Sequence, residues 1–114
     1  MDLSIIIPAH CEEHKIGQDV REACSFLQEQ KLDGEIIVVD DGSMDQTAAV
    51  ARQAGAGQPV TVIRLESNRG KGYAVRQGIC RSSSRVVMFC DSGRCTPPRF
   101  TSTGTQPLCA GHAP

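Results

Sequence analysis

Four short apolar runs divide the chain and predict buried β-strands. Each run is rich in β-branched residues and is closed by a proline or an acidic residue. Runs of this kind lack the alternation of a strand with one wet face, and they are typical of parallel strands that helices cover on both sides. The four runs span residues 4–8, 35–40, 60–65 and 85–90.

Between these strands, apolar residues recur at helical spacing and predict three amphipathic helices. The first covers residues 12–30. The second is expected to begin at Ser43, where Gln46 three residues later completes a capping box, and to end at Gly55. The third is short and follows the glycine-rich turn 68–72.

The alternating order of strands and helices predicts an α/β fold. With right-handed crossovers, this order gives a mostly parallel sheet flanked by helices. Ligands of such sheets bind outside the carboxyl ends of the strands. The unusual residues collect at those ends: 8–12 after the first strand, Asp40 and Asp41 after the second, and Asp91 after the fourth. The sequence therefore predicts a site at this edge.

Two adjacent carboxylates, Asp40 and Asp41, leave two interpretations open. Asp40 caps local backbone donors while Asp41 is solvated, or the pair accepts hydrogen bonds from a nucleobase N–H or from ribose hydroxyls. Nothing in the neighbouring Gly42 and Ser43 chooses between them.

The turn 68–72 carries two cations, Arg69 and Lys71, beside backbone N–H groups at the start of a helix. This combination suits a phosphate, although a tight connection with two exposed cations has the same pattern. The turn is not a Walker A loop, because Gly72 and Tyr73 follow the lysine. The first strand also lacks the Gly-x-Gly-x-x-Gly pattern of a dinucleotide-binding domain.

The sequence contains few candidate metal ligands. Asp91 could hold Mg²⁺ or Mn²⁺ on a diphosphate through oxygen ligands, but a single carboxylate makes a weak site. The six cysteines show no Cys-x-x-Cys spacing, so a zinc site is not favoured and free thiols are expected.

The chain shows no signal peptide and no apolar run near the ~20 residues of a membrane-spanning helix.

Three segments in order resemble the family 2 glycosyltransferases of the GT-A fold. Segment 4–13 is similar to that family's opening Pro-Ala-Tyr-Asn-Glu-Glu. Segment 35–47 is similar to its Val-Val-Asp-Asp-Gly-Ser-x-Asp-x-Thr, and segment 68–78 to its Asn-x-Gly-Lys-Gly-x-Ala-x-x-x-Gly. The resemblance is strongest to the branch of dolichyl-phosphate and polyprenyl-phosphate sugar transferases. It implies a Rossmann-like half-domain with a mostly parallel sheet.

The resemblance also implies a site for a nucleotide-diphospho-sugar. Its implied contacts fall into three groups, at the nucleotide, at the base with the ribose, and toward the diphosphate. They are Pro8, Ala9, His10 and Glu12 beside the nucleotide, Asp40 and Asp41 at the base and ribose, and Arg69 and Lys71 toward the diphosphate.

Asp91 matches the first acid of the family's Asp-x-Asp, whose Mg²⁺ or Mn²⁺ bridges the phosphates and stabilises the leaving diphosphate. Gly93 stands where the second acid belongs, so the resemblance implies a weakened metal site. His10 and Cys11 replace the usual Tyr and Asn. No catalytic base is identified.

Composition divides the chain in two. All 13 acidic residues lie at or before Asp91, and the last 23 residues contain none. We therefore expect residues 1–91 to form the nucleotide-sugar-binding part and residues 92–114 to be a divergent, disordered tail. An out-of-frame or spliced end on a truncated gene is our hypothesis for that tail. The net charge of −1 argues against a polybasic arm, so no nucleic-acid partner is expected.

The expected function is transfer of a hexosyl group, from UDP-hexose or a similar donor, to a polyprenyl-phosphate or glycan acceptor. The alternative is an inactive truncated fragment that binds a nucleotide or a partner, and we expect this chain alone to lack turnover. A receiver-like signalling module is disfavoured, because the acid pair of a receiver follows its first strand, whereas Asp40 and Asp41 follow the second strand here. The expected location is the cytoplasm, or the cytoplasmic face of a membrane in a longer form.

Overall fold

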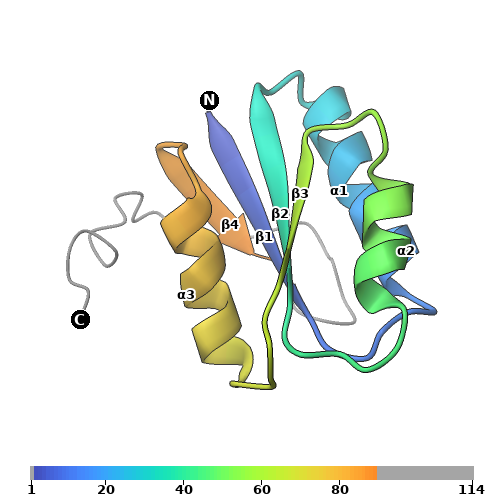
Figure 1. Ribbon diagram of the computed structural model, residues 1–114. Coiled ribbons are helices and arrows are strands. Elements are labelled where there is room, and N and C mark those ends of the chain that lie inside the picture. Colours follow the sequence, from blue (N-terminus) through green and yellow to red (C-terminus); the bar gives the residue numbers. More distant parts are fainter. Residues whose placement is uncertain (1, 90–114) are drawn as a thin grey trace.

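The computed structural model describes residues 2–89, which form alternating strands and helices around one sheet (Figure 1). The alternation confirms the order that the sequence predicts. In chain order the elements are β1 (Leu3–Ala9), α1 (Ile16–Glu29), β2 (Gly34–Asp40), α2 (Thr47–Ala54), β3 (Val60–Arg64), α3 (Lys71–Arg81) and β4 (Val86–Phe89).

All four strands are parallel, and their spatial order is β3-β2-β1-β4. In the register of β1 and β2, Ala9 lies opposite Asp40, so the carboxyl ends of these two strands meet at one edge. The loops that follow them therefore start side by side. This arrangement confirms the predicted α/β fold.

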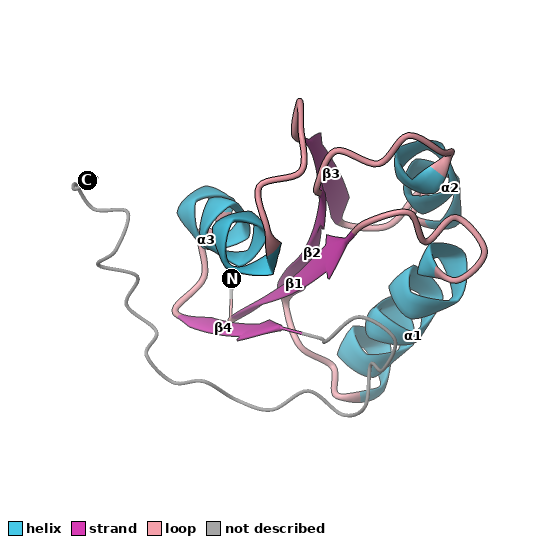
Figure 2. Cartoon of the chain, turned by 90° about the horizontal axis from the view of Figure 1, so that it is seen from below, coloured by secondary structure: helices cyan, strands magenta, loops and turns pink. Residues whose placement is uncertain are grey.

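The helices cover both faces of the sheet, with α1 and α2 on one side and α3 on the other (Figure 2). Alternate residues of β1 pack against the helices on opposite faces of the sheet. Ile5 and Ile7 pack with Val20 of α1, whereas Ile6 packs with Ala74 of α3. Because both faces of β1 are buried, the strand shows a continuous apolar run rather than an alternating one.

Two predicted helix starts are wrong. Residues 13–15 form a turn rather than the first turn of a helix, and the N–H groups of Lys15 and Ile16 both bond to the carbonyl oxygen of Glu12, at 2.9 and 2.8 Å. Ser43 is not the cap of the second helix, which begins at Thr47. The hydroxyl of Ser43 instead accepts the N–H of Cys11, 2.7 Å away on another loop.

The structure also bears on the expectations for membrane spans and for cysteines. Among residues 2–89, no helix is long and apolar enough to cross a membrane. Cys11 and Cys24 are free thiols, as expected, whereas Cys80 is disulfide-bonded, which corrects the expectation for that residue. Asp91 and the predicted tail 92–114 lie outside the described residues.

The contact between α3 and the sheet depends on Gly78. A Cβ atom there would lie 2.5 Å from Ile6 Cγ2 and 3.3 Å from Val39 Cγ2. We expect Gly78→Ala to lower the free energy of unfolding by about 1–3 kcal/mol, because the stiff, buried isoleucine has no room to move. Chemical denaturation measures this change.

Gly72 is the matched control on the same helix, because a Cβ atom there meets nothing within 4 Å. Gly72→Ala should be neutral or stabilising by up to about 1 kcal/mol, the helix propensity of alanine over glycine. Equal effects of the two substitutions would contradict the close packing of α3 on β1.

Candidate functional site

A pocket of about 310 Å³ opens at the carboxyl ends of the central strands. The end of β1, the loops after β1, β2 and β3, and the first turn of α3 form its walls. Most of the residues predicted for nucleotide binding meet here, although they come from three separate segments of the chain. The lining residues are Pro8, Ala9, His10, Glu12, Asp41, Asn68, Gly70, Lys71 and Ala74.

Asp41 ties two of these segments together. Its side chain is buried, at 4% exposure, so the interpretation of a solvated Asp41 is wrong. One carboxylate oxygen accepts the N–H of Arg69 at 2.7 Å, and the other accepts the N–H of Gly70 at 2.9 Å. These amides, which the sequence suggested for a phosphate, are satisfied by the carboxylate. Asp41 therefore fixes the glycine-rich loop at the pocket wall.

Asp40 lies behind the pocket rather than on its wall. It is fully buried, and its Oδ1 accepts the N–H of Ser43 at 3.0 Å. The guanidinium of Arg64 lies 3.9 Å from its Oδ2 and donates to the carbonyl oxygen of Ser43 at 3.1 Å. The contact to a local backbone donor is the one that the capping interpretation of Asp40 predicts.

Arg69 does not line the pocket either. Its guanidinium stacks over the ring of Tyr73, 5.1 Å from the ring centre, on the first turn of α3. This cation–π contact holds the side chain along the helix. Lys71, two residues later, is the cation of this loop that lines the pocket.

His10 joins the pocket walls through its ring. Its Nδ1 lies 2.9 Å from the carbonyl oxygen of Asp41. Because a carbonyl only accepts, the neutral ring carries its proton on Nδ1 and leaves Nε2 as an acceptor. The side-chain nitrogen of Asn68 lies 3.1 Å from Nε2 and can donate to it. One imidazole therefore links the loops after β1, β2 and β3.

Asn68, Gly70 and Ala74 also line the pocket, although the sequence did not single them out as site residues. All three belong to the segment that resembles the family. Asn68 carried the clearest signal, since an amide at the start of a glycine-rich loop is a ready donor and acceptor.

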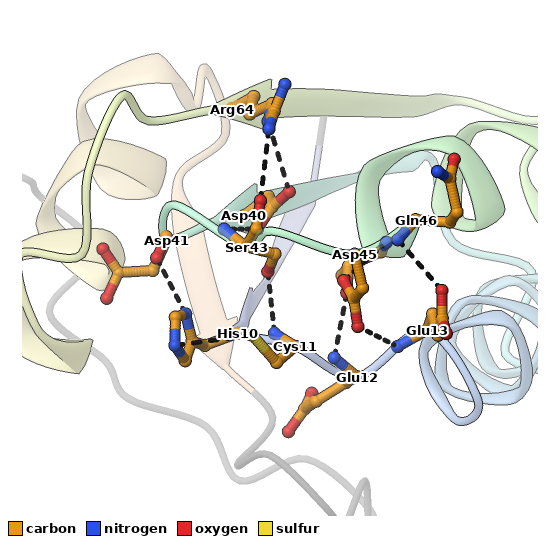
Figure 3. A network of polar contacts seen from close by, with 11 residues as sticks. His10, Cys11, Glu12, Glu13, Asp40, Asp41, Ser43, Asp45, Gln46 and Arg64 are labelled. Carbon is orange, nitrogen blue, oxygen red and sulfur yellow. Dashed lines mark hydrogen bonds and ion pairs between the residues drawn. The ribbon is translucent and has the colours of Figure 1, made fainter.

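The loop after β1 is held by side chains from the loop after β2 (Figure 3). The N–H of Cys11 donates to the hydroxyl of Ser43, and the N–H of Glu12 donates to the hydroxyl of Thr47 at 2.9 Å. The N–H of Glu13 reaches Asp45 Oδ2 at 3.4 Å. We call Ser43, Asp45 and Thr47 the brace.

A return contact completes this network. Glu13 Oε1 accepts the N–H of Gln46 at 3.0 Å. The hydroxyl of Thr47 donates to Asp45 Oδ1 and, with further hydrogen bonds from backbone N–H groups, lowers the pKa of that carboxyl. Asp45 is therefore held as the ionised acceptor that the network needs.

The charges at the pocket are mixed. Glu12 and Asp41 supply carboxylates, and Lys71 supplies a cation at the N-terminus of α3. Among residues 2–89, no group of three His, Cys, Asp or Glu side chains could hold a metal ion. The predicted metal ligand, Asp91, lies outside this part of the chain.

Known proteins are similar to most of this chain. The model of glycosyl transferase family 2 matches residues 4–101. The dolichyl-phosphate beta-glucosyltransferases of Homo sapiens and Drosophila melanogaster are each 41% identical to the chain, over 102 and 106 residues. The matches cover 82% and 84% of the chain but 32% of each relative. The chain thus spans about a third of the length of these curated relatives.

Solved structures show the same fold. One is glucosyl-3-phosphoglycerate synthase from Mycobacterium tuberculosis, in complex with Mn²⁺, UDP and glucosyl-3-phosphoglycerate. It is 31% identical with a TM-score of 0.63, and the match covers 80% of this chain and 33% of that one. Mannosyl-3-phosphoglycerate synthase from Rubrobacter xylanophilus is 23% identical with a TM-score of 0.68, over 80% of this chain and 30% of that one, and it supports the fold alone.

The fold and the family model agree, which confirms the resemblance found in the sequence. Because the family model matches the chain from residue 4 to residue 101, the chain belongs to glycosyl transferase family 2.

Proposed function

We propose that this chain supplies the donor-binding part of a glycosyltransferase. Its pocket would bind a nucleotide-diphospho-sugar, with UDP-hexose as the favoured donor. The observation that carries the proposal is the pocket itself, because Asp41, His10 and Lys71 converge there from three loops at the carboxyl ends of the strands. Open α/β sheets bind their ligands at this edge.

Two parts of the pocket wall suit different ends of the ligand, the base and the diphosphate. A uracil offers one N–H donor, which the carboxylate of Asp41 can accept through the lone pairs that the backbone leaves unused. The backbone of Pro8, Ala9 and His10 would border the nucleotide. Lys71, at the N-terminus of α3, suits the diphosphate, because the helix dipole and the ammonium both favour an anion.

Relatives support both the donor and the metal. The Mycobacterium tuberculosis synthase, which is 31% identical, was solved with UDP and Mn²⁺. For this chain we propose Mg²⁺ or Mn²⁺ on Asp91, at a site that Gly93 weakens because it offers no carboxylate. The bound metal would stabilise the leaving diphosphate.

The acceptor and the place of action rest on relatives alone. Names such as dolichyl-phosphate beta-glucosyltransferase support a polyprenyl-phosphate acceptor, and a glycan is the second candidate. A polyprenyl phosphate is a membrane lipid, so such an acceptor would place the reaction at a membrane surface, and we propose the cytoplasmic face for a longer form of the chain. The competing function is a non-catalytic fragment that keeps the nucleotide pocket. This function rests on the same pocket, and a measurement of turnover distinguishes it from the transferase.

Calorimetric titration with uridine, UDP, GDP and UDP-glucose tests donor binding. We expect UDP and UDP-glucose to bind and Mn²⁺ to tighten binding, and Lys71→Gln to weaken the diphosphate ligands more than uridine. Arg52→Gln, which removes an exposed cation on α2, is the matched control. The absence of binding by any nucleotide at millimolar concentration would overturn the proposal.

Turnover is measured separately, with radiolabelled UDP-glucose and a polyprenyl phosphate. We expect no transfer by this chain alone, since we assign no catalytic base among residues 2–89. Hexose transfer by the purified chain would contradict the fragment function and support a complete enzyme.

A further inference from the structure

The brace makes a regular pattern of contacts across two loops. Three successive backbone N–H groups, at Cys11, Glu12 and Glu13, each donate to a different brace side chain. The acceptors come from Ser43, Thr47 and Asp45, which share the alternating spacing of the Ser-x-Asp-x-Thr pattern. Ser43 accepts from Cys11, Asp45 from Glu13 and Thr47 from Glu12, so the three side chains together satisfy three neighbouring amides.

Thr47 has a directional role in this pattern. Its hydroxyl has one proton, which it donates to Asp45 Oδ1. Its lone pairs are therefore left to accept the N–H of Glu12 at 2.9 Å. The ionised Asp45 also accepts the N–H of Thr47 at 3.0 Å, which holds the start of α2 in place. A hydroxyl that both donates and accepts polarises the two bonds in the same sense.

The loop after β1 needs such support. Cys11 has a φ of +52°, in the left-handed region that a side chain disfavours. Its N–H is nevertheless held at 2.7 Å by Ser43, whose side chain is buried. A strained backbone of this kind persists only where surrounding contacts over-determine it.

The brace lies behind the pocket, whereas the loop it holds lines the pocket. His10 and Glu12 are on the pocket wall, and Ser43, Asp45 and Thr47 are not. Thr47 is fully buried, so it has no surface to offer a ligand. Any effect of these side chains on a ligand must therefore pass through the loop.

We propose that Ser43, Asp45 and Thr47 are positioning residues, which hold the loop 10–13 in the shape that nucleotide binding requires. This inference rests on the proposed function, because it assigns the brace to the same pocket. It gives the second half of the Asp-Asp-Gly-Ser-x-Asp-x-Thr pattern a role that involves no contact with the donor.

Thr47→Val tests the inference, because valine keeps the shape and removes the hydroxyl. The substitution removes both the bond from the N–H of Glu12 and the bond to Asp45. We expect faster amide hydrogen exchange at Glu12, by about fivefold or more, and about fivefold weaker UDP binding, because the N–H of Glu12 loses its acceptor. Thr47→Ser keeps the hydroxyl and should restore both. Thr61→Val, on an exposed position of β3, is the matched control and should change neither.

The possible results separate a failure of the inference from a failure of the proposed function. Unchanged exchange and affinity in Thr47→Val, or failure of Thr47→Ser to restore them, would overturn the inference. If Thr47→Val does not fold, Ser43→Ala provides the same comparison, read at the amide of Cys11. If the wild-type chain binds no nucleotide, the proposed function fails and the link to the pocket fails with it. Amide exchange still decides in that case whether the brace holds the loop.

Discussion

Asp41→Ala is expected to abolish measurable nucleotide binding and to destabilise the chain. The substitution removes the acceptor of two backbone N–H groups, at Arg69 and Gly70. Hydrogen bonds to a charged partner contribute about 1.5–3 kcal/mol each, so we expect about 2–4 kcal/mol less free energy of unfolding after some rehydration of the amides. The proposed contact to the base is lost as well. Urea denaturation and UDP calorimetry measure the two effects.

Two further substitutions separate these effects. Asp41→Asn keeps one carbonyl acceptor without the charge, so it should retain part of the stability and lose most of the affinity for UDP. Glu66→Ala removes an exposed acid shortly before the same loop and should change neither quantity. UDP affinity that is unchanged in a folded Asp41→Ala chain would exclude this carboxylate from the donor site.

The fold could be predicted closely because its signals are local. Both faces of β1 and β2 are buried, so their apolar runs are continuous and easily distinguished from the helices. Gly55 ends α2 as predicted, although its φ of −95° is outside the left-handed region that usually favours glycine at a helix end. The parallel order then follows from the alternation of elements and the handedness of crossovers.

The failures concern side chains with distant partners. Ser43 has the local signature of a helix cap, yet its hydroxyl bonds to Cys11, 32 residues earlier. Asp41 was open to interpretation as a solvated acid, yet it bonds to amides 28 and 29 residues later. Local propensity describes only what a residue does with its neighbours, and tertiary contacts override it at these two positions.

The site could be predicted only in outline, because the fold places the residues at strand ends but does not show which way each side chain points. Residues at strand ends, such as Ala9, His10 and Asp41, are placed by the fold and do line the pocket. Asp40 is adjacent in sequence but turns to the opposite side, where Arg64 lies. Successive residues of a strand face opposite ways, so two neighbouring carboxylates seldom share one pocket wall.

Gly42→Ala is expected to cause the other large loss. Gly42 has a φ of +71°, and a Cβ atom there would lie 2.5 Å from the backbone carbon of Ser67 and 2.6 Å from the backbone nitrogen of Asn68. Backbone atoms cannot rotate away as side chains do, so the loop before α3 must move. We expect a loss of more than about 3 kcal/mol in the free energy of unfolding, from strain and overpacking together.

Gly57→Ala isolates the steric part of this prediction. Gly57 has a φ of +80°, but a Cβ atom there meets nothing within 4 Å. Its substitution should therefore cost only the backbone strain, about 1 kcal/mol, and leave UDP binding unchanged. Denaturation and calorimetry on both variants give the comparison, and equal losses would contradict the close approach of the two loops. A larger loss at Gly42 would mean that the turn after β2 must contain glycine, because the loop that Asp41 binds passes directly over it.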